Sequence, residues 1–149
     1  HSSTSRGLGD VYKRQLLDEV SELWCIVCRD ADTGEVTTFG PEDVVKGVKY
    51  LMSSDEIIGH NIINYDIPAL RALGYINGEP IPKTTDTLVM SRLIHTNLSE
   101  QDRLKNLKAE YIPSKLVGSH SLKAWGHRLD CHKGTYIEEH GYDHYSEGM

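Results

Sequence analysis

The amino-acid sequence predicts an α/β domain, because short apolar runs of strand type alternate with segments of helical periodicity. Residues 23–28 form one such run, and Ile57 and Ile58 form the centre of another. Between them, residues 41–52 open with Pro-Glu-Asp and then place valine and leucine side chains on one helical face. A chain of 149 residues is long enough for one domain of this kind.

Turn residues and periodicity predict the individual elements. A hairpin is expected from strands over residues 23–29 and 35–39, because Asp32 and Gly34 between them are typical turn residues. The other predicted elements are a helix over 41–52, a strand over 56–59, a helix at Asp66, a loop over 77–82, a helix over 86–97 with Asp86 as its N-cap, a polar loop over 99–115, a helix over 122–129 and a polar tail over 136–149.

The most informative segment is the strand, turn and helix of residues 57–74. Pro68 is tolerated only near a helix start, because its missing N–H must coincide with an unpaired one. Asp66 therefore lies in the first helical turn, where the positive end of the helix dipole keeps a carboxylate ionised. Such a carboxylate, fixed beside the end of a strand, is suited to bind a divalent cation. The alternative, and the commoner role for this position, is that Asp66 only interacts with the helix dipole.

Three sequence blocks together resemble a known family. Asn61, followed after three residues by Tyr65-Asp66, resembles the second exonuclease motif of the DEDD superfamily. The blocks that begin at Thr84 (TTDTLVMSRLIHTNL) and Gly118 (GSHSLKAWGHRLDCHKG) follow in order. Over residues 16–149 the chain thus resembles the 3′–5′ proofreading exonuclease domain of the family-A DNA polymerases of short-tailed bacteriophages.

This resemblance implies a ribonuclease H-like fold, a mixed sheet with flanking helices, of which the first strand and the C-terminal motif helix are missing. The family's first motif is Asp-x-Glu, and its third is a Tyr followed at helical spacing by an Asp. Asp18 and Glu19 do not form the first motif, and Tyr142-Asp143 lacks the spacing of the third. Of the family's four metal-binding carboxylates, only Asp66 is carried over to this chain.

The family's chemistry uses two divalent cations about 3.5–4 Å apart, which activate a water and stabilise the leaving 3′ oxygen of a phosphodiester. Mg²⁺ or Mn²⁺ is the implied cofactor, with two ions expected only in the complete domain. Asp66 would be the catalytic metal ligand, Asn61 would hold the turn or touch the substrate, and Tyr65 would pack beneath the site. His60 and Lys133 are further candidates for binding substrate or supporting the site.

The two ends of the chain are predicted to be atypical. Residues 1–15 resemble a translated adapter sequence and are expected to be non-native and disordered, which leaves 16–149 as a partial exonuclease domain. This fragment is expected to be inactive, because one carboxylate cannot hold two metal ions. The resemblance implies a parent chain with a C-terminal polymerase module, acting on single-stranded DNA 3′ ends and primer–template DNA in the cytoplasm of a phage-infected bacterium.

The charge distribution is compatible with this function. The formal net charge of −6 is unusual for a DNA-binding protein, but a nuclease cleft is acidic until metal binds. Basic residues gather in the segment 101–134, where they could hold a phosphate backbone or simply form a solvated surface. No apolar run is long enough to predict a membrane span. The basic residues of this segment include Arg103, Lys105, Lys108, Lys115, Lys123, Arg128 and Lys133.

Cys25 and Cys28 form a C-x-x-C pattern, for which zinc binding is the first hypothesis. Both are expected on one strand, where side chains three residues apart point to opposite faces. The sequence therefore predicts free cysteines and no zinc.

Two other functions stay open from the sequence. One is a stand-alone DEDD-type exoribonuclease, and the other is a non-catalytic nucleic-acid-binding module. A polymerase module downstream would exclude the first, and an Asp-x-Glu on an upstream strand would favour an enzyme over the second.

Overall fold

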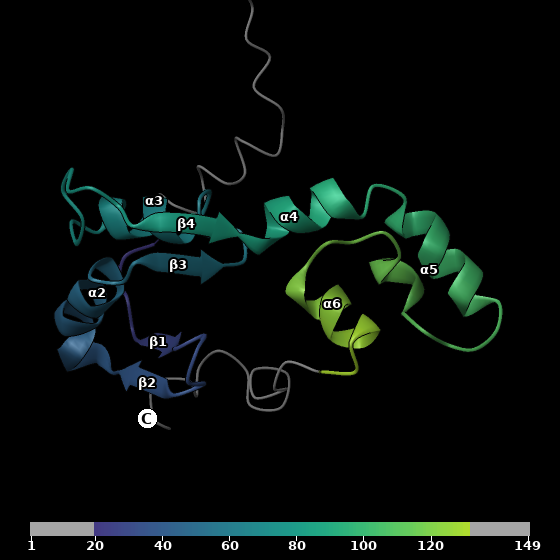
Figure 1. Cartoon of the computed structure of the whole chain (residues 1–149), viewed down its shortest axis with the longest axis horizontal. Helices are drawn as coiled ribbons and strands as arrows, with labels where there is room; N and C mark the ends of the chain where they lie inside the picture. Colours follow the sequence, from purple (N-terminus) through teal and green to yellow (C-terminus); the bar gives the residue numbers. More distant parts are fainter. Residues whose placement is uncertain (1–19, 132–149) are drawn as a thin grey trace, which may run out of the picture. The chain divides into compact units, whose positions relative to one another are not determined.

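The computed structural model describes residues 20–131, which form an α/β structure in two compact units (Figure 1). The first unit runs to Asp86 and the second begins at Thr87. Along residues 20–131, no helix combines the length and hydropathy needed to cross a membrane. The predictions for residues 1–15, Asp18, Glu19, Lys133 and the tail over 136–149 lie outside the described residues.

The first unit starts with the predicted hairpin. Strand β1 (Ile26–Arg29) pairs antiparallel with β2 (Val36–Phe39). The Asp30 carboxylate accepts hydrogen bonds from the backbone N–H groups of Asp32 (2.9 Å) and Thr33 (2.8 Å), which fixes the turn between the strands. The hairpin prediction is confirmed, although each strand begins later in the chain than expected.

A helix follows the hairpin and forms much of the unit's core. The 3-10 turn η1 (Pro41–Asp43) leads into α2 (Val44–Met52), so the helix predicted over 41–52 is confirmed with a tighter first turn. Its apolar face supplies the first hydrophobic cluster, in which Val44 and Val48 are buried with Leu70 and Ile76. This cluster is bordered by Leu23, Ile26, Leu51, Met52 and Tyr75.

The second sheet of this unit is a parallel pair of strands. Strand β3 (Glu56–Gly59) lies beside β4 (Lys83–Asp86), as Figure 1 shows. Helix α3 (Asp66–Ala72) falls between the two strands in sequence. Its Ile67 is buried with Ile57 and Ile62 in a second hydrophobic cluster. The predictions of a strand over 56–59 and a helix at Asp66 are confirmed.

Strand β4 was not predicted. The loop over 77–82 and the start of a helix directly after Asp86 are as expected, but residues 83–86, between the loop and helix α4, form this strand. The strand has the sequence Lys-Thr-Thr-Asp, so it offers no apolar pattern. It is held instead by pairing with β3 and by side chains, since Thr85 and Lys83 donate hydrogen bonds to the Glu56 carboxylate at 2.5 and 3.3 Å.

The second unit is helical in its described part. It contains α4 (Thr87–Ile94), α5 (Leu98–Asn106), the 3-10 turn η2 (Ser114–Leu116) and α6 (Leu122–Arg128). The prediction of α6 is confirmed, whereas α4 ends before residue 97.

Helix α5 occupies much of the segment that was expected to be a polar loop over 99–115, so that prediction was wrong. The helix buries only Leu98 and Asp102. A buried aspartate does not register as an apolar position, and the helical period was therefore hidden in the sequence.

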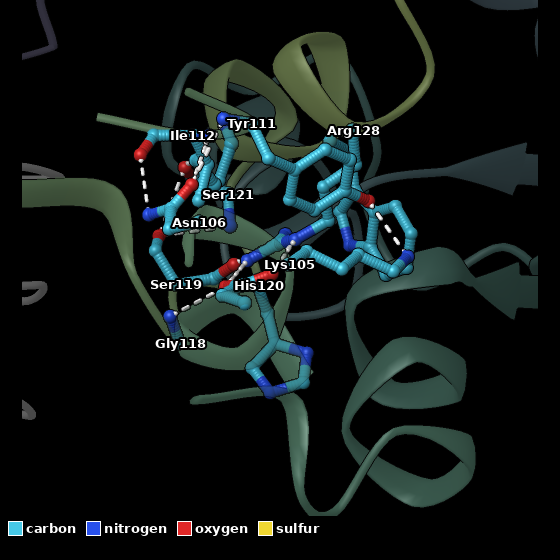
Figure 2. A network of polar contacts seen from close by, with 12 residues as sticks. Lys105, Asn106, Tyr111, Ile112, Gly118, Ser119, His120, Ser121 and Arg128 are labelled. Carbon is cyan, nitrogen blue, oxygen red and sulfur yellow. Dashed lines mark hydrogen bonds and ion pairs between the residues drawn. The ribbon is translucent and has the colours of Figure 1, made fainter. Parts of the chain in front are cut away.

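Asp102 is buried against Arg128, and the two form an ion pair in this unit. Figure 2 shows Arg128 within the surrounding network of polar contacts. Arg128 donates from Nε to Oδ1 of Asp102 (3.0 Å) and from Nη2 to Oδ2 (2.7 Å), and its Nη1 donates to the Ser119 carbonyl (2.7 Å). The Gly118 N–H donates to Asp102 as well (2.8 Å). Burial by itself would raise the pKa of Asp102, but these hydrogen bonds and the Arg128 charge hold the pKa below its ordinary value.

The network continues through Trp125. The Arg128 guanidinium lies 4.9 Å from the centroid of the Trp125 ring, and the indole N–H donates to Ser91 Oγ (2.9 Å). Ser91 Oγ lies 2.7 Å from His120 Nδ1. Burial, followed by the charges of Arg92 and Arg128, lowers the pKa of His120, which favours the neutral ring at pH 7. The sequence block that begins at residue 118 therefore builds the interior of this unit.

Replacing Arg128 with alanine is expected to lower the free energy of unfolding by about 3–5 kcal/mol, because Asp102 would remain buried without its cation. Urea unfolding followed by tryptophan fluorescence measures the loss. Arg103→Ala, at an exposed arginine of α5, is the control and should change stability by less than about 0.5 kcal/mol. Combining Asp102→Leu with Arg128→Met should cost less than Arg128→Ala alone, and an equal or larger loss would contradict the ion-pair explanation.

Candidate active site

The candidate site lies where the two parallel strands of the first unit end. Gly59 and Asp86 are paired as the last residues of β3 and β4. The chain leaves Gly59 through a turn over residues 60–65 and enters α3 at Asp66. Because parallel strands end at the same edge of a sheet, this arrangement brings the Asp66 and Asp86 carboxyl groups into the same neighbourhood.

Asp86 holds the turn that precedes α3. Its side chain is only 4% exposed, and its two carboxylate oxygens accept hydrogen bonds from the backbone N–H groups of Asn61 (2.9 Å) and Ile63 (3.2 Å). From the sequence, Asp86 is expected only as a helix N-cap, and its contact with the turn is not predicted. The available signal was an aspartate directly after two β-branched threonines, which marks the end of a short strand.

The turn itself is tightly constrained. Asn61 has a φ of 63°, in the left-handed region that residues other than glycine rarely occupy. Its carbonyl accepts the Tyr65 N–H (2.9 Å), and the Ile62 carbonyl accepts the Ile67 N–H (3.0 Å), so the turn runs directly into α3. The Asn61 side-chain oxygen Oδ1 is buried and has no hydrogen-bond partner among the described residues. A buried acceptor of this kind requires a partner from elsewhere, such as water or a ligand.

Asp66 is the first residue of α3, as predicted. The residue is exposed as a whole, but the surroundings of its carboxyl group exclude water and raise the pKa. The nearby charge of Asp86 raises the pKa further, while the backbone N–H of Asp66 acts in the opposite direction. The expectation that the helix start keeps Asp66 ionised was therefore wrong, because burial and the Asp86 charge raise the pKa by more than the helix start lowers it.

The other predicted site residues take different positions. Asn61 lies in the turn, as expected, and His60 is half-buried beside it. Tyr65 directly precedes α3 and is 39% exposed, which is more than a side chain packed beneath the site would show. Lys133 lies outside the described residues.

The described part of the chain does not supply a complete set of ligands for a metal ion. Within residues 20–131, no group of three or more His, Cys, Asp or Glu side chains is placed to hold a metal ion. Asp66 offers a carboxylate, the ligand type that Mg²⁺ prefers, whereas both Asp86 oxygens accept backbone N–H groups. The Asp66 carboxylate therefore fits a hard divalent cation that takes its further ligands from elsewhere.

The C-x-x-C pair is arranged differently from the expectation. Cys28 lies in β1, but Cys25 precedes the strand, so the argument from opposite strand faces does not hold as stated. Both thiols are half-buried and free, and burial raises the pKa of Cys28, which disfavours its thiolate. The absence of zinc stays a prediction.

No protein-family model matches the chain. Among curated proteins, the DNA-directed DNA polymerases of Escherichia phage T7 and Enterobacteria phage T3 are each 36% identical to it over an alignment that covers 95% of the chain. This chain is similar to a phage DNA polymerase. It spans 22% of the length of these relatives, and the similarity confirms the predicted resemblance to phage DNA polymerases.

Replacing Asp66 with asparagine is expected to stabilise the protein at neutral pH. The raised pKa means that the folded state disfavours the charged form, so the neutral amide removes a cost that exists above the ordinary Asp pKa of about 3.9. Because the residue is exposed, solvent screening should keep the gain below about 1 kcal/mol.

The gain should shrink as the pH falls and vanish once the carboxyl is protonated in both folded and unfolded states. Thermal melting at a series of pH values measures it, with Asp55→Asn, at an exposed carboxylate outside the turn, as the control. A melting temperature that falls in Asp66→Asn at pH 7 would mean that the helix start outweighs burial after all.

Proposed function

We propose that this chain is part of the proofreading 3′–5′ exonuclease domain of a phage DNA polymerase. In the intact parent, two divalent metal ions would hydrolyse phosphodiester bonds at DNA 3′ ends. The observation that carries the proposal is the position of Asp66, which begins α3 directly after a strand-end turn. The similarity of the chain to phage DNA polymerases supports it.

Asp66 would supply a carboxylate oxygen to Mg²⁺ or Mn²⁺, and the bound cation would polarise the water and the phosphodiester. Burial and the Asp86 charge raise the pKa of Asp66 when no cation is near. A cation beside Asp66 would reverse that effect by stabilising the ionised carboxylate. The buried Asn61 Oδ1, which has no partner among residues 20–131, is available to accept a hydrogen bond from substrate or from metal-bound water. The other metal ligands would come from outside the described residues.

A ribonuclease H-like fold accounts for the two small sheets of the first unit. The antiparallel β1–β2 pair, helix α2 and the parallel β3–β4 pair follow one another in the order that this fold requires. One additional strand between β1 and β3 would join the pairs into a single mixed sheet and would pair their backbone groups.

The partners would be a single-stranded DNA 3′ end, primer–template DNA and a polymerase module in the same parent chain, in the cytoplasm of a phage-infected bacterium. Arg103, Lys105 and Lys108 are exposed in the second unit and could contact phosphates. The expectation that Arg128 belongs to this surface was wrong, because its side chain is 2% exposed and bound to Asp102. The names of both relatives specify DNA synthesis and give no support to a stand-alone exoribonuclease.

In the intact parent polymerase, Asp66→Ala is expected to lower exonuclease activity by more than about 100-fold, because even groups that merely orient a metal ligand contribute about 10–100-fold. Polymerase activity should be retained. Release of nucleotides from a labelled single-stranded DNA 3′ end measures the first, and primer extension the second. Asp55→Ala, an exposed acid just before β3, is the control. Retained exonuclease activity in Asp66→Ala would remove Asp66 from the site.

The 149-residue chain alone is expected to show no exonuclease activity with Mg²⁺ or Mn²⁺. A single carboxylate can bind one ion but leaves a second ion short of oxygens and does not offset the repulsion between the two. The same DNA assay, run beside a version extended at both ends to include the family's other motifs, tests this. Equal cleavage by the two proteins would show that the metal site is complete without those motifs.

A further inference from the structure

Asp86 is the best-connected polar side chain at the candidate site, and the proposed chemistry does not use it. It is 4% exposed, and both of its carboxylate oxygens bind backbone N–H groups of the turn over residues 60–65. Burying a carboxylate is costly unless hydrogen bonds compensate for the lost water. The two N–H groups provide this compensation, and as charge-assisted hydrogen bonds they are stronger than neutral ones.

These hydrogen bonds act on the part of the turn that needs support. One donor is the N–H of Asn61, whose φ of 63° lies in the left-handed region that asparagine tolerates but occupies less readily than glycine. The other donor is Ile63, two residues further along. Between them, the Ile62 side chain packs so closely on Gly59 that a Cβ there would lie 2.8 Å from Ile62 Cδ1 and 2.9 Å from its Cβ. Packing thus holds one side of the turn, and Asp86 holds its backbone.

The held turn determines where Asp66 lies. The Tyr65 N–H donates to the Asn61 carbonyl (2.9 Å), and the Ile67 N–H donates to the Ile62 carbonyl (3.0 Å). Asp66 lies between these two donors and begins α3. Its backbone is therefore connected to Asp86 through only two successive sets of hydrogen bonds.

We propose that Asp86 is a positioning residue, which fixes the Asp66 carboxylate for a divalent cation by binding the Asn61 and Ile63 N–H groups. This inference rests on the proposed function of Asp66 as a metal ligand. Asp86 acts through the turn, and its own oxygens are engaged with backbone donors at the end of β4. Groups that orient a metal ligand typically contribute about 10–100-fold to metal affinity.

The experiment measures Mn²⁺ binding to the 149-residue chain by paramagnetic broadening of backbone amide signals in the segment 60–66. Asp66→Asn tests the ligand itself. Asp86→Asn removes the carboxylate that holds the turn. Ile63→Pro keeps both carboxylates and removes one N–H donor, and Ile63→Ala is its matched control because it keeps that donor. Ile57→Val, in the buried core of β3, controls for a general loss of stability.

The expected result is that wild-type chain binds Mn²⁺ near Asp66, that Asp66→Asn abolishes the broadening, and that Asp86→Asn and Ile63→Pro each weaken binding by about 10-fold or more. Ile63→Ala and Ile57→Val should bind as wild type does. In Asp86→Asn, hydrogen exchange of the Asn61 and Ile63 amides should also accelerate by at least about 10-fold, since both lose their charged acceptor.

Each other outcome overturns a defined part of the argument. If wild-type chain shows no Mn²⁺ broadening near Asp66, or Asp66→Asn broadens equally, the proposed metal ligand fails and this inference fails with it. If Asp66 binds Mn²⁺ but Ile63→Pro binds as tightly as Ile63→Ala, positioning is refuted while the proposed function stands. If Mn²⁺ binding were then weaker in Asp86→Asn but not in Ile63→Pro, the cause would be the lost negative charge of Asp86. Should Asp86→Asn fail to fold, the comparison of Ile63→Pro with Ile63→Ala still decides the question.

Discussion

Two hydrogen bonds to one buried carboxylate connect the ends of the two parallel strands, and the geometry of the candidate site depends on them. Asp86 belongs to β4, whereas its donors, Asn61 and Ile63, follow β3. The turn between β3 and α3 is therefore fixed by a residue that is more than twenty positions away in sequence. Local propensity permits this turn, because asparagine tolerates the left-handed region better than most residues, but the contact with Asp86 fixes it.

The electrostatics of the site follow from the same arrangement. A carboxylate buried for structural reasons lies near a second carboxylate, and the fold thereby disfavours the charged form of Asp66. Placing the Asp66 and Asp86 carboxyl groups close together lowers stability at neutral pH. Perturbed acids of this kind gather at functional sites, where a cation or substrate offsets the cost.

The sequence predicted elements whose stability comes from local signals. The strand over 56–59, the hairpin and the helix at Asp66 follow from apolar runs, turn residues and Pro68, and all are present. Strand β4 and helix α5 were missed because side-chain polarity hides them: β4 has no apolar residue, and α5 buries an aspartate. The roles of Asp86 and Asp102 depend on partners 16–26 positions away, and a single sequence without known pairings does not reveal such contacts.

The ion pair of the second unit also limits how this protein can be divided. Asp102 and Arg128 are 26 positions apart, and their side chains are 1% and 2% exposed. A shortened version of the chain must therefore keep both residues. An end placed before Arg128 would leave the buried Asp102 carboxylate without the guanidinium that pairs with it. Domain boundaries chosen from hydrophobic periodicity alone could fall in the polar stretch between α5 and α6 and separate Asp102 from Arg128. For expression and fusion experiments, residues 98–131 should be kept together.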